Sequence, residues 1–530
     1  MAIHPALEEK GFTPFHAAQM VEKARWAAEA FSTYGGEETL KIAEAVANAG
    51  HAEARRYAKW AVEETGFGVV EHKIIKNEAC SKGIFDRYRQ ENLTGVRENP
   101  AEKLLEIARP AGVVFALTPS TNPIATLYYK ILIALMGRNA IVISPHPMAT
   151  VCSVDAANFL ARAAEDAGAP DGVIQVIPEP SIPIIERVMK SDRIDVILAT
   201  GGSPVVRAAY SSGNPAIGVG PGNVPAFVDE SADVARAARM IADSKSFDNG
   251  ILCTNESAVI AHSAVADRLE QDLRRNGCHI CTSEERDRLE RVLFPDDTFD
   301  TTLVGKSAEI IASKAAIRVA ARTRVLVAPL ERIGDDYPLS REKLCPVLGF
   351  YEAASRDAAM IASKAMTRRS GRGHSAAIHA EDAGIILRFG SEMNVLRIVV
   401  NAGSSLGASG FETNLAPTMT IGTGFFGRSS VAENVGPQHL VQWVKLAWNK
   451  DARIAMPSFG RLETPRAPRV SRSPKGAIDY DFGNPPPGSG LATHKRDDGN
   501  IRAEIRRIIL EELRSMATEG RSGSTGRSGR

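Results

Sequence analysis

Residues 112–144 have the sequence GVVFALTPSTNPIATLYYKILIALMGRNAIVIS. Residues 112–117 are an uninterrupted apolar run, which is typical of a strand buried on both faces of a parallel sheet. Prolines and short polar side chains at 118–123 predict a turn, residues 124–135 predict a helix, and residues 140–144 predict a second buried strand. A strand, a helix and a strand without a hairpin turn indicate a parallel βαβ unit.

The same alternation continues on the C-terminal side of this unit. Helices are expected at 150–167, 184–190 and from 205, and strands at 173–177, 194–199 and 224–228. A second α/β region follows from 257 to about 415, with strands expected at 258–261, 325–327, 375–378 and 397–400. The sequence therefore predicts an α/β protein with a doubly wound parallel sheet, whose ligands bind at the carboxyl ends of the strands.

The flanking segments differ in character. Residues 13–106 are rich in Ala, Glu, Lys and Arg with apolar residues three or four apart, which predicts a helical lead-in. We expect the helical lead-in and cofactor-binding domain at 1–229, a catalytic domain at 230–425, a return or oligomerisation segment at 426–460 and a flexible tail at 461–530. Within the tail, residues 501–516 predict an amphipathic helix that docks on a partner or folds back on its own chain.

Composition excludes several classes of protein. A formal net charge of +1 gives no argument for nucleic acid as the main partner. Six scattered cysteines do not form a disulfide framework and favour a reducing compartment. Neither a signal peptide nor a membrane-spanning apolar segment is visible, so we expect a cytoplasmic protein.

A single cysteine stands out. Cys253 follows the turn-forming Asp248-Asn249-Gly250 and precedes an apolar strand, so a loop between a helix and a strand holds it. A thiolate in such a place is a strong nucleophile once its pKa falls. A buried and inert cysteine is the alternative interpretation.

Two glycine clusters are candidates for ligand binding. Thr200, Gly201, Gly202 and Ser203 join a strand to a helix, where backbone N–H groups can approach a phosphate or form a plain tight turn. The cluster at 218–223 precedes a strand and does not follow one, so dinucleotide-fingerprint mechanics do not apply. We expect these glycines to allow a backbone crossover beside the active site.

Together these motifs resemble the CoA-acylating branch of the aldehyde dehydrogenase superfamily. The resemblance covers about residues 104–440, and it is carried by runs at 117–123, 144–147, 198–203, 209–213, 218–223, 245–253, 342–347, 373–374 and 433–437. It implies an aldehyde dehydrogenase-like fold with an α/β catalytic domain. It also implies that a short-chain aldehyde, CoA and NAD(P)⁺ give acyl-CoA and NAD(P)H.

The resemblance assigns roles to three catalytic residues. It makes Cys253 the nucleophile that forms a thiohemiacetal and then a thioester, and it makes Asn122 an oxyanion donor together with the backbone N–H of Cys253. Gly218 stands where hydrolytic relatives carry a Glu base, which favours a thiol acceptor over water. His374 is the remaining acid/base candidate, with a structural histidine as the alternative.

The resemblance also implies a cofactor site. Glu342, before the Pro346-Val347 pair, matches the partner of the nicotinamide ribose, and the adenosine end is expected near Ser144 and His146. The remaining cofactor residues expected from the motifs are Thr118, Pro119, Thr200, Gly201, Gly202, Ser203, Gly218 and Gly220. NAD is favoured over NADP. No metal is expected, since Cys278 and Cys281 lack a second pair.

Partners and alternatives remain open at this point. Acylating members in bacterial microcompartments carry a terminal amphipathic helix on a Pro/Gly-rich tether, so residues 501–516 are interpreted as a shell-protein ligand (an encapsulation peptide), and a homodimer or homotetramer is expected. Arg428 meets an anionic substrate such as sulfoacetaldehyde or is simply solvated, and Cys345 is expected to be a packing residue. A hydrolytic aldehyde dehydrogenase giving free acid and a catalytically silent scaffold are the competing interpretations.

Overall fold

The structure is a computed structural model, and it describes residues 11–334 and 336–459. The predicted helix at 501–516 and the rest of the tail lie outside the described residues. No helix within the described ranges is long and apolar enough to cross a membrane.

Helices form the N-terminal part of the described chain, as predicted. They are α1 (Pro14–Phe31), α2 (Gly36–Ala52), α3 (Ala54–Thr65), α4 (Val70–Glu78) and α5 (Ile84–Tyr88), with a π-helical turn at Ala79–Gly83 between the last two. Their small buried side chains, such as Ala24, Ala43 and Ala58, let them pack closely on one another and on the sheet behind them.

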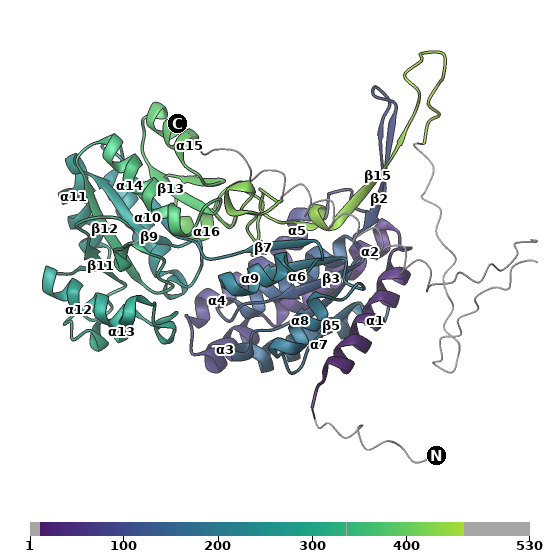
Figure 1. The fold of residues 1–530 in the computed structure, drawn as a ribbon, viewed down its shortest axis with the longest axis horizontal. Coiled ribbons are helices and arrows are strands. Elements are labelled where there is room, and N and C mark those ends of the chain that lie inside the picture. The colour runs from purple at the N-terminus through teal and green to yellow at the C-terminus, as the bar shows by residue number, and fades with distance from the viewer. Residues whose placement is uncertain (1–10, 335, 460–530) are drawn as a thin grey trace, which may run out of the picture. The chain divides into compact units, whose positions relative to one another are not determined.

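The prediction of helix as far as residue 106 is wrong at its end. Two strands, β1 (Val96–Asn99) and β2 (Leu104–Pro110), occupy that stretch. They join β15 (Val441–Ala447) in an antiparallel sheet of order β1-β2-β15, in which Pro110 pairs with Val441. The partner strand lies more than 300 residues away along the chain, so local periodicity gave no signal for it. In Figure 1 β2 and β15 continue into a ribbon that projects away from the helices.

The predicted βαβ units form a five-stranded parallel sheet. Its order is β5-β4-β3-β6-β7, and its strands are β3 (Val113–Leu117), β4 (Ala140–Ser144), β5 (Ile174–Val176), β6 (Val196–Thr200) and β7 (Ala216–Val219). The connecting helices are α6 (Pro123–Met136), α7 (Thr150–Asp166), α8 (Ile182–Met189) and α9 (Ser203–Tyr210). The chain moves outward from β3 to β5 and then returns to β6 beside β3, so the topological switch point lies between β3 and β6.

A second sheet of seven parallel strands follows. Its order is β10-β11-β12-β9-β8-β13-β14, and its strands are β8 (Val224–Val228), β9 (Glu256–His262), β10 (Cys278–Ile280), β11 (Val325–Pro329), β12 (Val347–Ala353), β13 (Ser375–His379) and β14 (Arg397–Val400). Its helices are α10 (Val234–Ser246), α11 (Ser263–Arg275), α12 (Ser283–Leu293), α13 (Ala308–Lys314), α14 (Arg356–Arg369), α15 (Ala383–Glu392) and α16 (Ser404–Gly407). These two sheets confirm the predicted aldehyde dehydrogenase-like α/β fold.

The chain passes from the five-stranded to the seven-stranded sheet at residues 220–223, between β7 and β8. This crossover precedes residue 229, where the sequence placed the end of the first region. The crossover is the backbone path that the glycines at 218–223 were expected to allow. The expectation that this cluster does not follow a strand is wrong, because β7 ends at Val219 within it.

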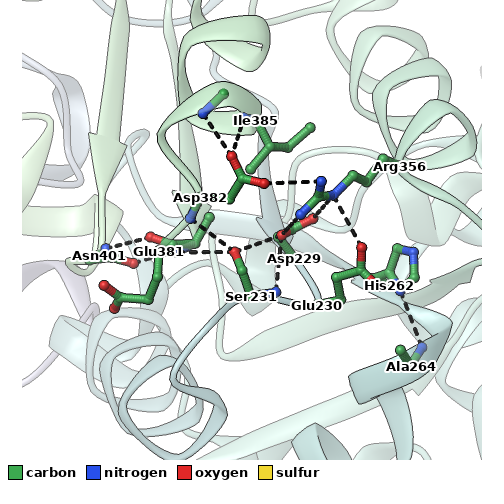
Figure 2. Close-up of polar contacts among 12 residues, drawn as sticks. Asp229, Glu230, Ser231, His262, Ala264, Arg356, Glu381, Asp382, Ile385 and Asn401 are labelled. Atoms are coloured by element: carbon green, nitrogen blue, oxygen red, sulfur yellow. Dashed lines mark hydrogen bonds and ion pairs between the residues drawn. The ribbon is translucent and has the colours of Figure 1, made fainter.

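A polar network holds the carboxyl end of the seven-stranded sheet. Arg356, at the start of α14, donates through Nε and Nη2 to the two carboxylate oxygens of buried Asp229, at 2.9 and 2.8 Å. Figure 2 shows Asp382 and Glu230 at the same guanidinium and Ser231 beneath it. Because Cys253 precedes β9, this network lies at the end of the sheet away from Cys253, so we assign it a structural role.

Candidate active site

The Cys253 loop is built on left-handed backbone. After α10, Asp248, Asn249 and Gly250 have φ values of 48°, 54° and 64°. A Cβ at Gly250 would lie 2.7 Å from the carbonyl oxygen of Cys345, so only glycine fits there. The turn delivers Cys253 to a partly exposed position directly before β9, whereas the five other cysteines are buried.

The Cys253 thiol is protonated in the free protein. Burial and, to a smaller extent, the nearby Glu342 carboxyl raise its pKa to about 12, and Arg397 acts in the opposite direction. The thiol is therefore not a standing thiolate, and its activation depends on what surrounds it.

Three sequence-predicted residues meet around Gly222. A Cβ on Gly222 would lie 2.2 Å from the carbonyl oxygen of Cys253 and 3.2 Å from Cε1 of His374. The backbone N–H of Gly222 donates to Oε1 of Glu342 at 2.8 Å. The structure thus brings Cys253, Glu342 and His374 together around the crossover between the two sheets.

Glu342 is uncharged near neutral pH. Burial raises its pKa to about 8, against the opposing effects of the Gly222 N–H, Lys245 and Lys343. A carboxyl with this pKa exchanges its proton within the physiological range, as groups at functional sites often do.

His374 has a free ring nitrogen. Its Nδ1 lies 2.9 Å from the hydroxyl of Ser375, whereas its buried Nε2 has no hydrogen-bond partner among the described residues. Burial, followed by the charge of Arg397, lowers the pKa of His374 to about 3. The imidazole is therefore neutral at physiological pH and can accept a proton at a ring nitrogen.

Arg397 organises the loops around His374, and sequence reasoning missed it. Its guanidinium donates to the carbonyls of Gly373, His374, Gly422 and Ala432 and to Oδ1 of Asn434. The available signal was an arginine at the first position of a short strand, where burial requires many acceptors. One buried side chain thus joins two glycine-rich loops, at 373–374 and 422, to the segment at 432–434.

Asn122 follows the last residue of β3 by five positions and is the N-cap residue of α6. Its side chain is buried, and its Oδ1 accepts a hydrogen bond from Nζ of Lys76. Lys76 also pairs with Asp248, which in turn binds Lys73 at 3.1 Å. Sequence reasoning missed both lysines, because nothing in their helix distinguishes them from solvated lysines.

The predicted cofactor residues gather at the carboxyl ends of the five-stranded sheet. Thr118 and Pro119 follow β3, Ser144 ends β4, His146 follows it, and Thr200–Ser203 join β6 to α9. The buried hydroxyls of Thr118 and Ser144 have no hydrogen-bond partner among the described residues. An open depression of about 420 Å³ runs along α9 and is lined by Ser203, Pro204, Arg207, Ala208 and Ser211. The unpaired hydroxyls of Thr118 and Ser144 and the N-terminus of α9 fit the phosphates and riboses of a dinucleotide.

The two glycines assigned to the cofactor differ in their surroundings. A Cβ at Gly218 would lie 2.8 Å from Val206 and 3.1 Å from Tyr210, whereas nothing lies within 4 Å of that point at Gly220. The side-chain direction of Gly218 is thus filled by α9. Pro346 is buried directly before β12, four residues after Glu342.

The remaining polar candidates play smaller parts. His279, Cys281 and Glu285 have ligand atoms within 4.8 Å of one another, but Glu285 already bonds His279 and the backbone N–H of Thr282. Cys345 lies in the hydrophobic core, as expected of a packing residue. Arg428 is exposed on its loop.

Comparisons with known sequences bear on these residues. A model of the aldehyde dehydrogenase family matches residues 10–281. An aldehyde-alcohol dehydrogenase of Clostridium acetobutylicum is 40% identical over 78% of this chain and 48% of its own length. The acetylating succinate-semialdehyde dehydrogenase of Clostridium kluyveri is 34% identical over 84% of this chain and 98% of its own. An acylating sulfoacetaldehyde dehydrogenase of Bilophila wadsworthia is 39% identical over 73% of this chain and 85% of its own length. The chain spans about half the length of the aldehyde-alcohol dehydrogenases it matches.

Solved structures agree in fold. The acetylating aldehyde dehydrogenase of Geobacillus thermoglucosidasius is 38% identical, with a TM-score of 0.81 over 82% of this chain and 97% of its own. A propionaldehyde dehydrogenase from a Clostridium phytofermentans microcompartment is 28% identical, and its TM-score is 0.75. The match covers 82% of this chain and 97% of that chain. The propionaldehyde dehydrogenase of Rhodopseudomonas palustris is 26% identical and was solved with bound CoA and an acylated cysteine. Its TM-score is 0.75, and the match covers 82% of this chain and 97% of that chain.

Proposed function

Because the chain belongs to the aldehyde dehydrogenase family, we propose that it is a CoA-acylating aldehyde dehydrogenase in which Cys253 is the nucleophile. The reaction converts a short-chain aldehyde, CoA and NAD(P)⁺ into acyl-CoA and NAD(P)H. The observation that carries the choice of acceptor is Gly218: hydrolytic relatives place a Glu base there, and here α9 fills that space.

The first half of the reaction needs a nucleophile and oxyanion donors. The sulfur of Cys253 adds to the aldehyde carbonyl and forms a thiohemiacetal. Nδ2 of Asn122 and the backbone N–H of Cys253 are the proposed donors to its oxyanion, because hydrogen-bond donors held at that point stabilise the developing charge. A nicotinamide held beside Cys253 would supply the hydride acceptor, and loss of the hydride leaves a thioester on Cys253.

The second half needs a base and an acceptor thiol. The free Nε2 of neutral His374 takes the proton of the CoA thiol, whose sulfur then attacks the thioester and displaces the Cys253 thiolate. Because the pKa of His374 is about 3, the imidazole is neutral throughout the neutral range, but it is a weak base in the free protein.

The cofactor would be held from both sheets. Thr118, Ser144 and the start of α9 supply hydroxyls and N–H groups for its adenosine and phosphate portions, and Glu342 lies on the Cys253 side for the nicotinamide ribose. We favour NAD over NADP. Fluorescence titration of the protein with NADH and NADPH measures the choice directly.

Product formation from propionaldehyde, with and without CoA, tests the function. We expect strict CoA dependence, acyl-CoA as product and loss of turnover in Cys253→Ala, whereas Cys80→Ala, in the buried helical lead-in, retains turnover. CoA-independent formation of free acid would establish the hydrolytic alternative instead.

His374→Ala separates the two halves of the reaction. With CoA present, the variant should give one equivalent of NAD(P)H in a burst and then turn over slowly, and mass spectrometry should find acylated Cys253. A normal steady-state rate would remove His374 from the mechanism.

Arg428 and the sulfoacetaldehyde relative support a second substrate class. Arg428 is exposed on a glycine-rich loop, and an arginine suits recognition of a sulfonate. Arg428→Ala should raise KM for sulfoacetaldehyde and leave KM for propionaldehyde unchanged. Equal effects on both aldehydes would exclude the anionic substrate.

The tail supports a proposal about location. A structural relative comes from a bacterial microcompartment, and residues 501–516 have the amphipathic pattern of a shell-binding helix on a Pro/Gly-rich tether. Deletion after Asp498 should abolish co-purification with shell protein without changing activity. Unchanged co-purification would contradict the targeting role. Light scattering of the full chain tests the proposed homodimer or homotetramer.

A further inference from the structure

Lys76 contacts both halves of the active site. It lies on α4, is 1% exposed, and its ammonium donates to Oδ1 of Asn122 and to Oδ2 of Asp248. Asn122 is the N-cap residue of α6, and Asp248 belongs to the turn five residues before Cys253. A single buried cation therefore joins the oxyanion donor to the loop that carries the nucleophile.

The contact with Lys76 determines which way the Asn122 amide faces. A carboxamide presents an acceptor oxygen and a donor nitrogen, which exchange places when the group rotates by half a turn. An ammonium has hydrogens only to donate, so the oxygen must face Lys76 and the nitrogen must face away. One N–H of Nδ2 lies 3.3 Å from the Thr121 hydroxyl, and the second remains for another acceptor.

The surrounding charges keep Lys76 in place. Burial alone would raise the pKa of Asp248, but Lys73 and Lys76 hold it below its ordinary value. Asp248 also accepts the backbone N–H of Val69 at 2.6 Å. Its carboxylate is thus a fixed anion that anchors the ammonium beside Asn122.

We propose that Lys76 is a positioning residue for the reaction: it holds the Asn122 carboxamide with Nδ2 toward the oxyanion and couples that donor to the Cys253 loop through Asp248. This inference rests on the proposed function, in which Asn122 donates to the oxyanion. Lys76 itself acts through Asn122 and does not touch the substrate.

A double-mutant cycle tests the proposal. Asn122→Ala should lower kcat about 100-fold, as expected for loss of one oxyanion donor. Lys76→Met, which keeps the length of the side chain and removes the donor, should lower kcat about 10- to 100-fold and leave the NADH dissociation constant unchanged. The two changes together should be no worse than Asn122→Ala alone, because Lys76 has nothing left to position.

Lys73→Met is the matched control. Lys73 also pairs with Asp248, but its second bond goes to the carbonyl of Thr121 and not to Asn122. Lys73→Met should lower the thermal stability about as much as Lys76→Met does. It should lower kcat much less than Lys76→Met does. An equal fall in kcat for the two lysine variants would overturn the proposal.

The outcomes separate this inference from the proposed function. If Lys76→Met lowers kcat by the same factor in the Asn122→Ala background, Lys76 acts independently of Asn122 and the inference fails. If Asn122→Ala alone leaves kcat unchanged, the oxyanion role in the proposed function fails. Should Lys76→Met not fold, Lys76→Gln completes the same cycle: it should lower kcat in the wild-type background and not in the Asn122→Ala background.

Discussion

The backbone N–H of Gly222 and the carboxyl of Glu342 are bonded at 2.8 Å, which ties the crossover between the two sheets to the segment that leads into β12. The carbonyl of Cys253 and the ring of His374 occupy the space that a side chain of residue 222 would enter. The active site is therefore sensitive both to the size of residue 222 and to the protonation of Glu342.

Glu342→Gln should change how stability depends on pH. The pKa of Glu342 is about 8 in the folded protein and 4.5 ordinarily. Between pH 4.5 and pH 8 the folded protein therefore keeps a proton on Glu342 that the unfolded chain has lost. More protons are bound in the folded state, so stability contributed by Glu342 is present below pH 4.5 and is lost as pH rises toward 8. In the wild type this effect lowers the free energy of unfolding by ~2 kcal/mol as the pH rises through this range, a figure reduced for partial solvent contact. We expect Glu342→Gln to abolish this decrease.

Thermal unfolding of the apoprotein from pH 5 to 9 checks this. Glu352→Gln, at an exposed position of β12, is the control, and parallel curves for wild type and Glu342→Gln would contradict the expectation.

Cys253 should react slowly with alkylating reagents in the absence of cofactor. Since burial and then Glu342 raise the pKa of its thiol to about 12, the thiolate fraction rises about tenfold per pH unit between pH 7 and 9. Glu342→Gln should accelerate alkylation at pH 9, where Glu342 is otherwise charged, and change it little at pH 6. Peptide mapping after iodoacetamide treatment measures the rate at Cys253 against the buried Cys80. A pH-independent rate would show that the thiol is already ionised.

Gly222→Ala should disable the enzyme. The added methyl group would lie 2.2 Å from the carbonyl oxygen of Cys253, so the nucleophile loop or the crossover must shift. A displacement of about 1 Å near the reacting atoms costs about 100-fold in rate. Gly390→Ala, where nothing lies within 4 Å of the new methyl group, should keep full kcat/KM. A crystal structure of Gly222→Ala with Cys253 undisplaced and full activity would refute the clash.

Arg397→Met should destabilise the fold around His374. It leaves buried carbonyls, including those of Gly373 and His374, without their donor, which costs about 3–5 kcal/mol. It also removes a charge that lowers the pKa of Cys253. Chemical denaturation measures the loss against Arg388→Met, a surface ion-pair residue expected to cost under about 1 kcal/mol. Equal losses for the two arginines would mean that the buried hydrogen bonds of Arg397 contribute little.

Local patterns explain what the sequence predicted correctly. Apolar runs such as 112–117 and 140–144 are typical of buried parallel strands, and the two sheets confirm the predicted alternation of strands and helices. The matching family model and relatives confirm the family resemblance. Cys253 and His374 could be chosen because their motifs are compact, and the structure brings both to Gly222. Their catalytic roles stay predictions.

Contacts that join distant segments could not be predicted in this way. Lys76 and Asp248 are 172 residues apart, and β2 pairs with β15 across more than 300 residues. A lysine in a helix or an arginine in a strand carries no periodic signal of its future partners. Arg397 becomes recognisable only when the loops at 373–374 and 422–434 have folded around it.

The position of β9 has a consequence for how this enzyme can diversify. β9 is the fourth of seven strands, and Cys253 lies three residues before its first residue, Glu256. Central strands exchange their amide hydrogens only through global unfolding, whereas exposed loops open locally. In the loop at 422–428 the side chain of Phe425, which is 91% exposed, can therefore be exchanged by mutation while the reactive sulfur keeps its place, whereas Gly422, Gly424 and Gly427 have no room for a Cβ. Selection for a different aldehyde can act on such loops without first having to rebuild the nucleophile.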